Sequence, residues 1–227
     1  MPTLLVTGAN RGLGLELARA YAAAGWTVHA TARDPARAAE LGAVAGAVEV
    51  HRLDIADPAQ VQDLAAALDG TAIDLLVNNA GVNMLERTSL ADLDYEGWER
   101  DFAVNTVAPL RLSAALADNV AASGGKTIAF MSSRAGSITS NIAGGRYRYR
   151  STKAALNAAI RSLALDLLPR GVICVAIHPG WARTDMGGPE AAISPAESAA
   201  WLKALFDRLE PHHAGHFLNY DGAELPW

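Results

Sequence analysis

The chain has 227 residues, of which 51% are apolar, and its formal net charge is −5 at pH 7. Chains of this length commonly form one α/β domain around a sizeable core, so we expect a single domain over residues 1–227. The negative charge disfavours nonspecific attraction to nucleic acid or to an anionic membrane surface, and we expect neither as a partner.

Targeting and redox signals are also weak. No apolar run approaches the ~20 residues that a membrane span needs, and the N terminus lacks the charged region and apolar core of a signal peptide. We therefore expect a cytoplasmic protein. The single cysteine, Cys174, lies in the apolar run 172–177, where a free thiol behaves as a small buried hydrophobe. This excludes a disulfide framework and a cysteine-based metal site, and we predict no metal.

Seven apolar segments alternate with helical patterns along the chain, which indicates βαβ units and a parallel sheet. The predicted strands cover residues 3–7, 27–31, 48–53, 73–78, 126–131, 172–177 and 215–218. The predicted helices cover residues 13–24, 58–68, 95–120, 150–168 and 195–209. Several strands are apolar on both faces, which predicts a doubly wound sheet of about seven strands with helices on both faces. Asp57-Pro58 and Ser194-Pro195 are start signals for two of these helices.

A glycine-rich turn follows the first predicted strand directly. It reads Gly8-Ala9-Asn10-Arg11-Gly12-Leu13-Gly14 and leads into a helical pattern. Glycines let backbone amides approach a pyrophosphate, and the start of the helix offers free N–H groups and a positive dipole end. The turn predicts nucleotide binding, although its spacing departs from the G-x-G-x-x-G fingerprint. Taken alone, the motif is equally compatible with a structural turn.

Tyr149 and Lys153 lie four residues apart in a predicted helix, which places both side chains on one face. A tyrosine has a pKa near ~10, and an ammonium within ~4–6 Å lowers it by ~1–3 units. The pair therefore predicts a proton-transfer site, with an ordinary surface helix as the alternative. Tyr147 is the competing tyrosine, but Ser151 stands where its lysine would have to be, so we assign it to packing or the pocket wall.

The order of these motifs resembles the short-chain dehydrogenase/reductase family over nearly the whole chain. The glycine turn is followed by Asn78-Asn79-Ala80-Gly81, Asn105, Ser133 and the Tyr149/Lys153 pair. Within the family, the second half is similar to the carbonyl reductases grouped with sniffer and bacterial C-factor. The segments that carry this similarity are 147–157, 178–181, 184–188 and 219–222. The resemblance implies a Rossmann-like fold.

The resemblance also implies four catalytic residues. Tyr149 would supply a proton, Ser133 would hold the substrate oxygen, and Lys153 would lower the pKa of Tyr149 and bind the nicotinamide ribose. Asn105 would hold a water that links Lys153 to solvent. Pro109 cannot donate to the carbonyl of Asn105, which is compatible with a water site there.

Cofactor contacts follow from the same resemblance. The implied positions are Gly8, Asn10, Arg11, Gly12, Leu13, Gly14, Arg33, Asp54, Ile55, Asn78, Ala80, Gly81, Tyr149, Lys153, Pro179, Gly180 and Thr184. Arg33 stands just after the second strand, where a guanidinium can bind the 2′-phosphate of NADP, and Arg11 is nearby in the turn. NADP(H) is therefore favoured over NAD(H), while Asp34 keeps NAD(H) open.

We predict an NADP(H)-dependent oxidoreductase that transfers a hydride between the nicotinamide and a carbonyl or alcohol substrate, such as a ketone, aldehyde or quinone. The alternative is an NADP(H)-binding signalling or interaction protein of C-factor type, with little or no turnover. By resemblance we expect a homo-oligomer, dimer or tetramer, formed through the helices near 95–120 and 150–168. The loop 185–194 carries Met186, Gly187 and Gly188 and has few anchors, which is compatible with closure over substrate.

Overall fold

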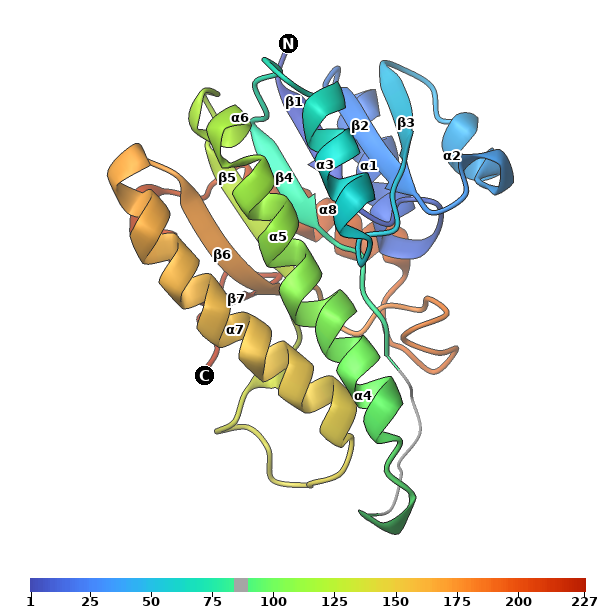
Figure 1. Ribbon diagram of the computed structural model, residues 1–227, viewed down its shortest axis with the longest axis vertical. Coiled ribbons are helices and arrows are strands. Elements are labelled where there is room, and N and C mark those ends of the chain that lie inside the picture. The colour runs from blue at the N-terminus through green and yellow to red at the C-terminus, as the bar shows by residue number, and fades with distance from the viewer. Residues whose placement is uncertain (84–89) are drawn as a thin grey trace.

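A seven-stranded, all-parallel sheet forms the centre of the computed structural model, which describes residues 1–83 and 90–227 (Figure 1). The strand order is β3-β2-β1-β4-β5-β6-β7, so the chain runs outward from β1 in both directions. The strands are β1 (Thr3–Val6), β2 (Thr27–Ala32), β3 (Val48–Arg52), β4 (Leu75–Asn78), β5 (Thr127–Met131), β6 (Ile173–His178) and β7 (Phe217–Asn219). Each predicted strand is confirmed within two residues, and so is the doubly wound fold.

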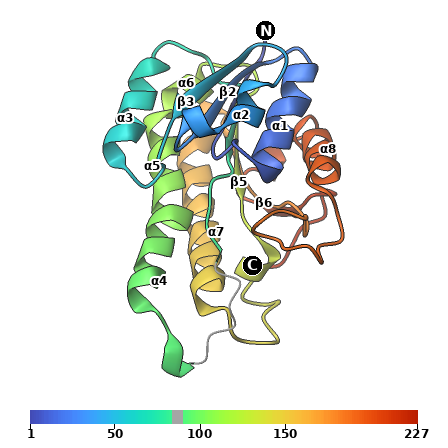
Figure 2. The same ribbon diagram turned by 90° about the vertical axis from the view of Figure 1, so that its right-hand side faces the viewer.

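Helices cover both faces of the sheet (Figure 2). On one face lie α1 (Gly12–Ala23) and α8 (Pro195–Phe206), and on the other lie α3 (Pro58–Ala67), α5 (Ala108–Ala115) and α7 (Tyr147–Leu167). Successive residues of a strand point to opposite faces. Leu4 and Val6 accordingly belong to the core on the α1 side, while Leu5 belongs to the core on the α7 side. Two apolar cores hold the sheet, which explains why its strands are apolar throughout.

The predicted helix 95–120 is interrupted. It consists of α4 (Tyr95–Phe102), the π-helical segment η3 (Ala103–Val107), α5 and α6 (Ala117–Ala121). Pro109 lacks the N–H that would bond the carbonyl of Asn105, and a wider π turn accommodates the missing bond. Within the described residues, no helix has the length and apolar character needed to cross a bilayer.

Most other helices match their predicted starts. Asp57 accepts hydrogen bonds from the amides of Ala59 and Gln60, and Ser194 forms a capping box with Glu197. α7 begins three residues earlier than predicted, and the short α2 (Ala39–Gly42) is not predicted at all. Short 3₁₀ segments are η1 (Pro35–Arg37), η2 (Leu90–Asp92), η4 (Arg134–Gly136), η5 (Leu168–Arg170) and η6 (Pro211–His213).

Candidate active site

A cleft of about 1230 Å³ lies at the carboxyl edge of the sheet. Its wall comes from the glycine turn, the ends of β2 to β6, the start of α7 and the segment 178–187. Ligands of open α/β sheets bind at this edge, where the direction of chain winding reverses. Ligand sites usually measure ~300–1,000 Å³, so the cleft can accommodate a dinucleotide together with a small substrate.

The glycine turn packs tightly against the segment after β4. Gly8 has a φ of +65°, and a Cβ there would lie 3.1 Å from the Cα of Ala80. A Cβ on Gly14 would come within 2.6 Å of both the Asn79 side chain and the Gly8 carbonyl. Among the described residues, no side chain caps the first turn of α1, because the N-cap residue is Arg11, whose guanidinium only donates hydrogen bonds. The amides of that turn are therefore available to an anion.

Asn79 is a site residue that the sequence analysis missed. Its Nδ2 donates to the carbonyls of Thr7 and Gly8 at 2.9 and 3.2 Å, and its own amide donates to the Thr7 hydroxyl at 3.0 Å. These bonds fix the end of β4 against the glycine turn. Asn78 is buried and donates to Ser113 at 3.0 Å, and its predicted contact with cofactor stays a prediction. Of the described cofactor positions, Asn78 and Gly14 are not part of the cleft wall.

The mouth of the cleft is rich in arginine. Arg33 is exposed there, whereas Asp34 turns its carboxylate to the amide of Ala36 at 3.2 Å and caps η1. Arg11 forms an ion pair with Asp185 across the mouth, which joins the glycine turn to the loop that follows Thr184. Both of these side chains are largely exposed, so the pair contributes little stability.

Tyr149 and Lys153 lie on one face of α7, as predicted, and both are buried, with exposed fractions of 9% and 5%. Ser133, which follows β5, lines the cleft with Tyr149 and is near enough to its hydroxyl to lower the pKa of that group. Lys153 Nζ donates to the carbonyl of Met131 at 2.7 Å and lies 5.9 Å from the centre of the Tyr149 ring. Three of the four predicted catalytic residues therefore meet in one place.

Burial has the largest effect on the pKa of both Tyr149 and Lys153. It raises the pKa of Tyr149, against the opposing effects of the Ser133 hydrogen bond and the positive charge of Arg146. It lowers the pKa of Lys153 to about 8. Lys153 is not among the groups that shift the pKa of Tyr149 here, and its effect on that pKa stays a prediction. The raised pKa keeps Tyr149 protonated at neutral pH, which is the form that a proton donor needs.

Arg146 is the second residue that the sequence analysis missed. It precedes α7 with a left-handed φ of 51°, and its guanidinium lies 5.3 Å from the centre of the Tyr149 ring. Its Nη2 donates to Asn83 at 3.5 Å. Arg146 stands only three residues before Tyr149, but the contact depends on the left-handed backbone conformation at Arg146, which the sequence does not indicate.

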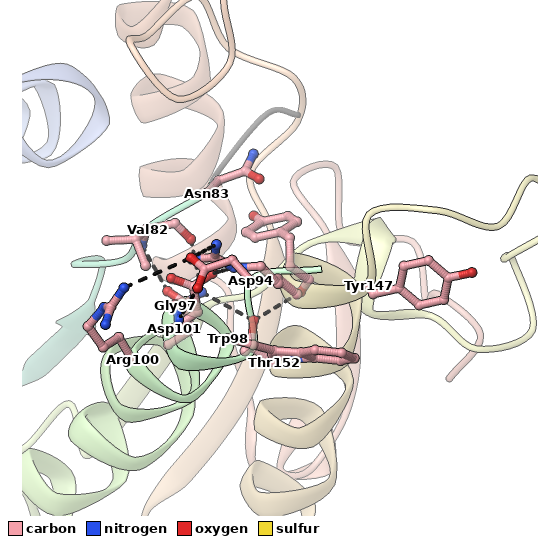
Figure 3. A network of polar contacts seen from close by, with 12 residues as sticks. Val82, Asn83, Asp94, Gly97, Trp98, Arg100, Asp101, Tyr147 and Thr152 are labelled. Carbon is pink, nitrogen blue, oxygen red and sulfur yellow. Dashed lines mark hydrogen bonds and ion pairs between the residues drawn. The ribbon is translucent and has the colours of Figure 1, made fainter. Parts of the chain in front are cut away.

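Asn105 forms hydrogen bonds with Val82 and Thr152, which are labelled in Figure 3. Its Oδ1 accepts from the amide of Val82 at 2.8 Å, and its Nδ2 donates to the Val82 carbonyl at 2.9 Å and to the Thr152 hydroxyl at 3.2 Å. The buried amide thus joins the segment after β4 to α7. Its main-chain carbonyl lies in η3, so the water-holding role stays a prediction.

Charged and aromatic groups fix the first turn of α7 against α4 (Figure 3). Arg148 donates to the carboxylate of the buried Asp101 at 2.8 Å and to that of Asp94 at 2.9 Å. Trp98 donates its indole N–H to Ser151 at 2.7 Å, and its ring contacts Tyr147 with centroids 6.4 Å apart. Tyr147 therefore packs against α4, while Tyr149 faces the cleft.

The segment after β6 closes the other side of the cleft. Pro179, Gly180 and Thr184 all line it, and the Pro179 carbonyl accepts from Ser198 at 2.6 Å. A Cβ on Gly12 would lie 3.2 Å from Thr184, so this segment packs directly over the glycine turn. His178, also in the wall, has its pKa lowered to about 4 by burial and by the charge of Arg134. Its imidazole is neutral at physiological pH.

This protein can be compared with others by its glycine turn, its Ser133–Tyr149 contact and its strand order. The model for short-chain dehydrogenases matches residues 2–193. The chain belongs to this family. This short-chain dehydrogenase is 43% identical to "C-signal" of Myxococcus xanthus over 155 residues, which cover 68% of this chain and 93% of that protein.

Two solved structures are also similar over the full length of the chain. The carbonyl reductase Sniffer of D. melanogaster has a TM-score of 0.93 at 32% identity, with 100% of both chains covered. The NADPH-bound carbonyl reductase from chicken fatty liver has a TM-score of 0.91 at 32% identity, with 100% of this chain and 99% of that chain covered. The family and the sniffer-like and C-factor-like resemblance are confirmed, and the chain is an oxidoreductase of this family.

Proposed function

We propose that this short-chain dehydrogenase reduces ketones, aldehydes or quinones with NADPH, and oxidises alcohols in reverse, with residues 1–227 acting as one dinucleotide-binding domain. One observation carries the proposal: Ser133, the buried Tyr149 and Lys153 line the cleft together, with Tyr149 and Lys153 on the same helix face. The similarity to two carbonyl reductases, one of them described as NADPH-bound, adds support.

The residues present fit a dinucleotide. The tight glycine turn and the amides of the first turn of α1 would hold the pyrophosphate. Arg33 would bind the 2′-phosphate, since Asp34 is engaged as the cap of η1. Lys153 would bind the nicotinamide ribose, and Pro179, Gly180 and Thr184 would contact the nicotinamide end. Arg11 would have to exchange its ion pair with Asp185 to contribute to phosphate binding.

NADPH, when bound, supplies the hydride from C4 of its nicotinamide. The Ser133 hydroxyl holds the substrate oxygen by a hydrogen bond and polarises the carbonyl. Tyr149 gives its proton to that oxygen as the carbonyl carbon accepts the hydride, so an alcohol forms and a phenolate is left on Tyr149. The positive charge of Arg146, which lowers the pKa of Tyr149, stabilises this phenolate. A water held by the Asn105 carbonyl would then return a proton from solvent.

Tyr149→Phe tests the proposal. The variant should bind NADPH within about twofold of the wild type, because the ring still packs, and lose roughly 10²–10⁴-fold in turnover with its proton donor. Tyr147→Phe is the matched control, since Tyr147 packs on Trp98, and it should keep most activity. NADPH oxidation is followed with a panel of ketones, aldehydes and quinones. Near-wild-type turnover of Tyr149→Phe on the best substrate would reject the role of Tyr149.

A second candidate is an NADP(H)-binding interaction protein with little turnover. The observation in its favour is the 43% identity to a protein named "C-signal". Against it stands the assembled Ser133, Tyr149 and Lys153 group, which an interaction surface does not need. The same substrate panel separates the two functions: tight NADPH binding without oxidation by any carbonyl compound would favour the interaction protein.

We also propose that the protein is a homo-oligomer that associates through α4 and α7. Three large apolar side chains on η3, α7 and η5 are exposed to solvent: Val107, Leu165 and Leu168. Leu165 is the most exposed of the three, at 57%. A second copy of the same surface would cover them, as is usual for isologous interfaces.

A further inference from the structure

Two histidines and a glutamate converge on one face of the sheet, outside the cleft. The parallel pairing of β2 with β3 places His29 opposite Glu49, and His51 lies two residues further along β3. Residues two apart in a strand point to the same face, so all three side chains share one side. Leu5 of β1 pairs with His29 and belongs to the core beneath α3 and α5. The three side chains therefore lie on the α3 and α5 side of the sheet. The three residues lie at the β3 edge of the sheet (Figure 1).

One ligand atom from each of the three side chains lies within 4.8 Å of the other two. His29 Nδ1 lies 2.9 Å from His51 Nε2, Glu49 Oε2 lies 3.6 Å from His29 Nδ1, and Glu49 Oε1 lies 3.7 Å from His51 Nε2. Zinc bonds of ~2.0–2.2 Å at tetrahedral angles set neighbouring ligand atoms about 3.3–3.5 Å apart. The separation of the two imidazole nitrogens is about half an ångström shorter than that spacing, and each carboxylate oxygen is slightly farther from its nearer imidazole, so a metal ion would fit after side-chain rotations.

A hydrogen bond between the two imidazoles is the simpler account of the 2.9 Å contact. It uses one ring N–H and one ring lone pair, but it leaves the Glu49 carboxylate at a distance where it accepts no hydrogen bond from either ring. A metal ion would engage all three donors at once. Each imidazole would then carry its single proton on its other nitrogen and present a lone pair to the ion.

We propose that His29, Glu49 and His51 form a binding site for a divalent ion of the zinc class. The two imidazoles, only 10% and 12% exposed, are held in place by the sheet, while the 66% exposed Glu49 leaves a path for the ion and for a water as fourth ligand. Imidazole ligands select zinc, nickel or copper over magnesium and calcium, which take oxygen ligands. The sequence analysis predicted no metal because it searched for cysteine patterns, and only the strand register brings these residues together.

The bound ion would join the edge strand β3 to β2. β3 leads directly into Asp54 and Ile55, which line the cleft. Since an ion that binds only the folded state raises its stability by mass action, zinc should make unfolding occur at a higher temperature. The site does not depend on the proposed reductase activity, so its test uses binding and stability as readouts.

The test is a zinc titration of the chelator-treated full chain, followed by competition with a chromophoric chelator, with metal content measured after gel filtration. The wild type should retain one zinc per chain and show a raised Tm with zinc but not with magnesium. Substitution even of groups that only support metal ligands costs ~10–100-fold in affinity. His51→Gln and Glu49→Gln should therefore weaken zinc binding by roughly tenfold or more and lose most of the Tm shift.

His212→Gln is the matched control. His212 lies 3.3 Å from Glu210 in an exposed pair elsewhere on the surface. The substitution therefore removes an imidazole next to a carboxylate without changing His29, Glu49 or His51. Its zinc content and affinity should equal those of the wild type. Glu49 is exposed, so Glu49→Gln will fold even if a histidine variant does not. Equal zinc affinity in the wild type and Glu49→Gln, or loss of zinc in His212→Gln, would overturn the proposal.

Discussion

Lys153→Met should make the protein more stable at neutral pH while removing its activity. The wild-type ammonium is buried, and its pKa falls from an ordinary 10.5 to about 8. At about 1.4 kcal/mol per unit of pKa, the charged form carries a penalty of about 3 kcal/mol at pH 7. Methionine removes this penalty and fills the space, but it leaves the Met131 carbonyl unpaired, which costs ~1–3 kcal/mol. The expected net gain is ~0–2 kcal/mol.

The dependence on pH of the stability difference between the wild type and Lys153→Met is a sharper test than its size at pH 7. Below pH 8 the lysine is protonated in both the folded and unfolded states, so the full penalty acts on the wild type. Between about 8 and 10.5 the folded protein releases the proton while the unfolded chain keeps it, so wild-type stability rises with pH. Relative to Lys153→Met, the wild type should gain about 1.4 kcal/mol per pH unit over this interval.

Denaturant unfolding of both proteins at pH 7, 8, 9 and 10 measures the effect. The difference in unfolding free energy between wild type and variant cancels every group that the two proteins share. Lys126→Met is the control, because it removes the same charge from a partly exposed position before β5, and it should produce no comparable rise. If the difference in unfolding free energy between the wild type and Lys153→Met stays constant from pH 7 to pH 10, Lys153 is not a destabilising buried cation.

Three further variants test the neighbouring features. In Gly136→Ala the new Cβ would lie 2.8 Å from the carbonyl carbon of Lys153, so α7 must shift. We expect the variant to lose ~1–3 kcal/mol of unfolding free energy and at least tenfold in turnover. Wild-type stability together with wild-type turnover would contradict this packing. Arg33→Asp should weaken NADPH at least tenfold more than NADH in a titration, and an unchanged preference rejects the 2′-phosphate contact. Leu165→Glu should convert the oligomer to single chains in light scattering, whereas a wild type that is already monomeric would rule out the interface.

Most of the sequence-based predictions that the structure confirms rest on the spacing of residues close together in the chain. Strands such as β4 and β6 are apolar on both faces, so their number and parallel arrangement could be inferred without coordinates. Tyr149 and Lys153 share a face because they are one helical turn apart. The helix starts at Asp57 and Ser194 follow from capping chemistry that acts over three residues.

Most of the interactions that could not be predicted join segments far apart in the chain. Asn79 and Thr7 are 72 residues apart and meet only because β4 pairs with β1. The Lys153 ammonium binds a main-chain carbonyl of β5, and a carbonyl carries no sequence signature. Arg146 reaches the Tyr149 ring through a left-handed backbone conformation that favours glycine or asparagine over arginine. In each case the tertiary structure, rather than local preference, decides the contact.

The active-site region therefore concentrates features that are locally unfavourable. Arg146 has a left-handed φ, η3 replaces a regular helical turn around Asn105, and the ammonium of Lys153 is buried. Each costs on the order of 1–3 kcal/mol and persists only where surrounding structure holds it. The ion pairs of Arg148 with α4 and the close packing of Gly136 on α7 supply that support. Substitutions that relieve these features should accordingly raise stability and reduce turnover together, because the same geometry that is costly to fold positions the proton donor.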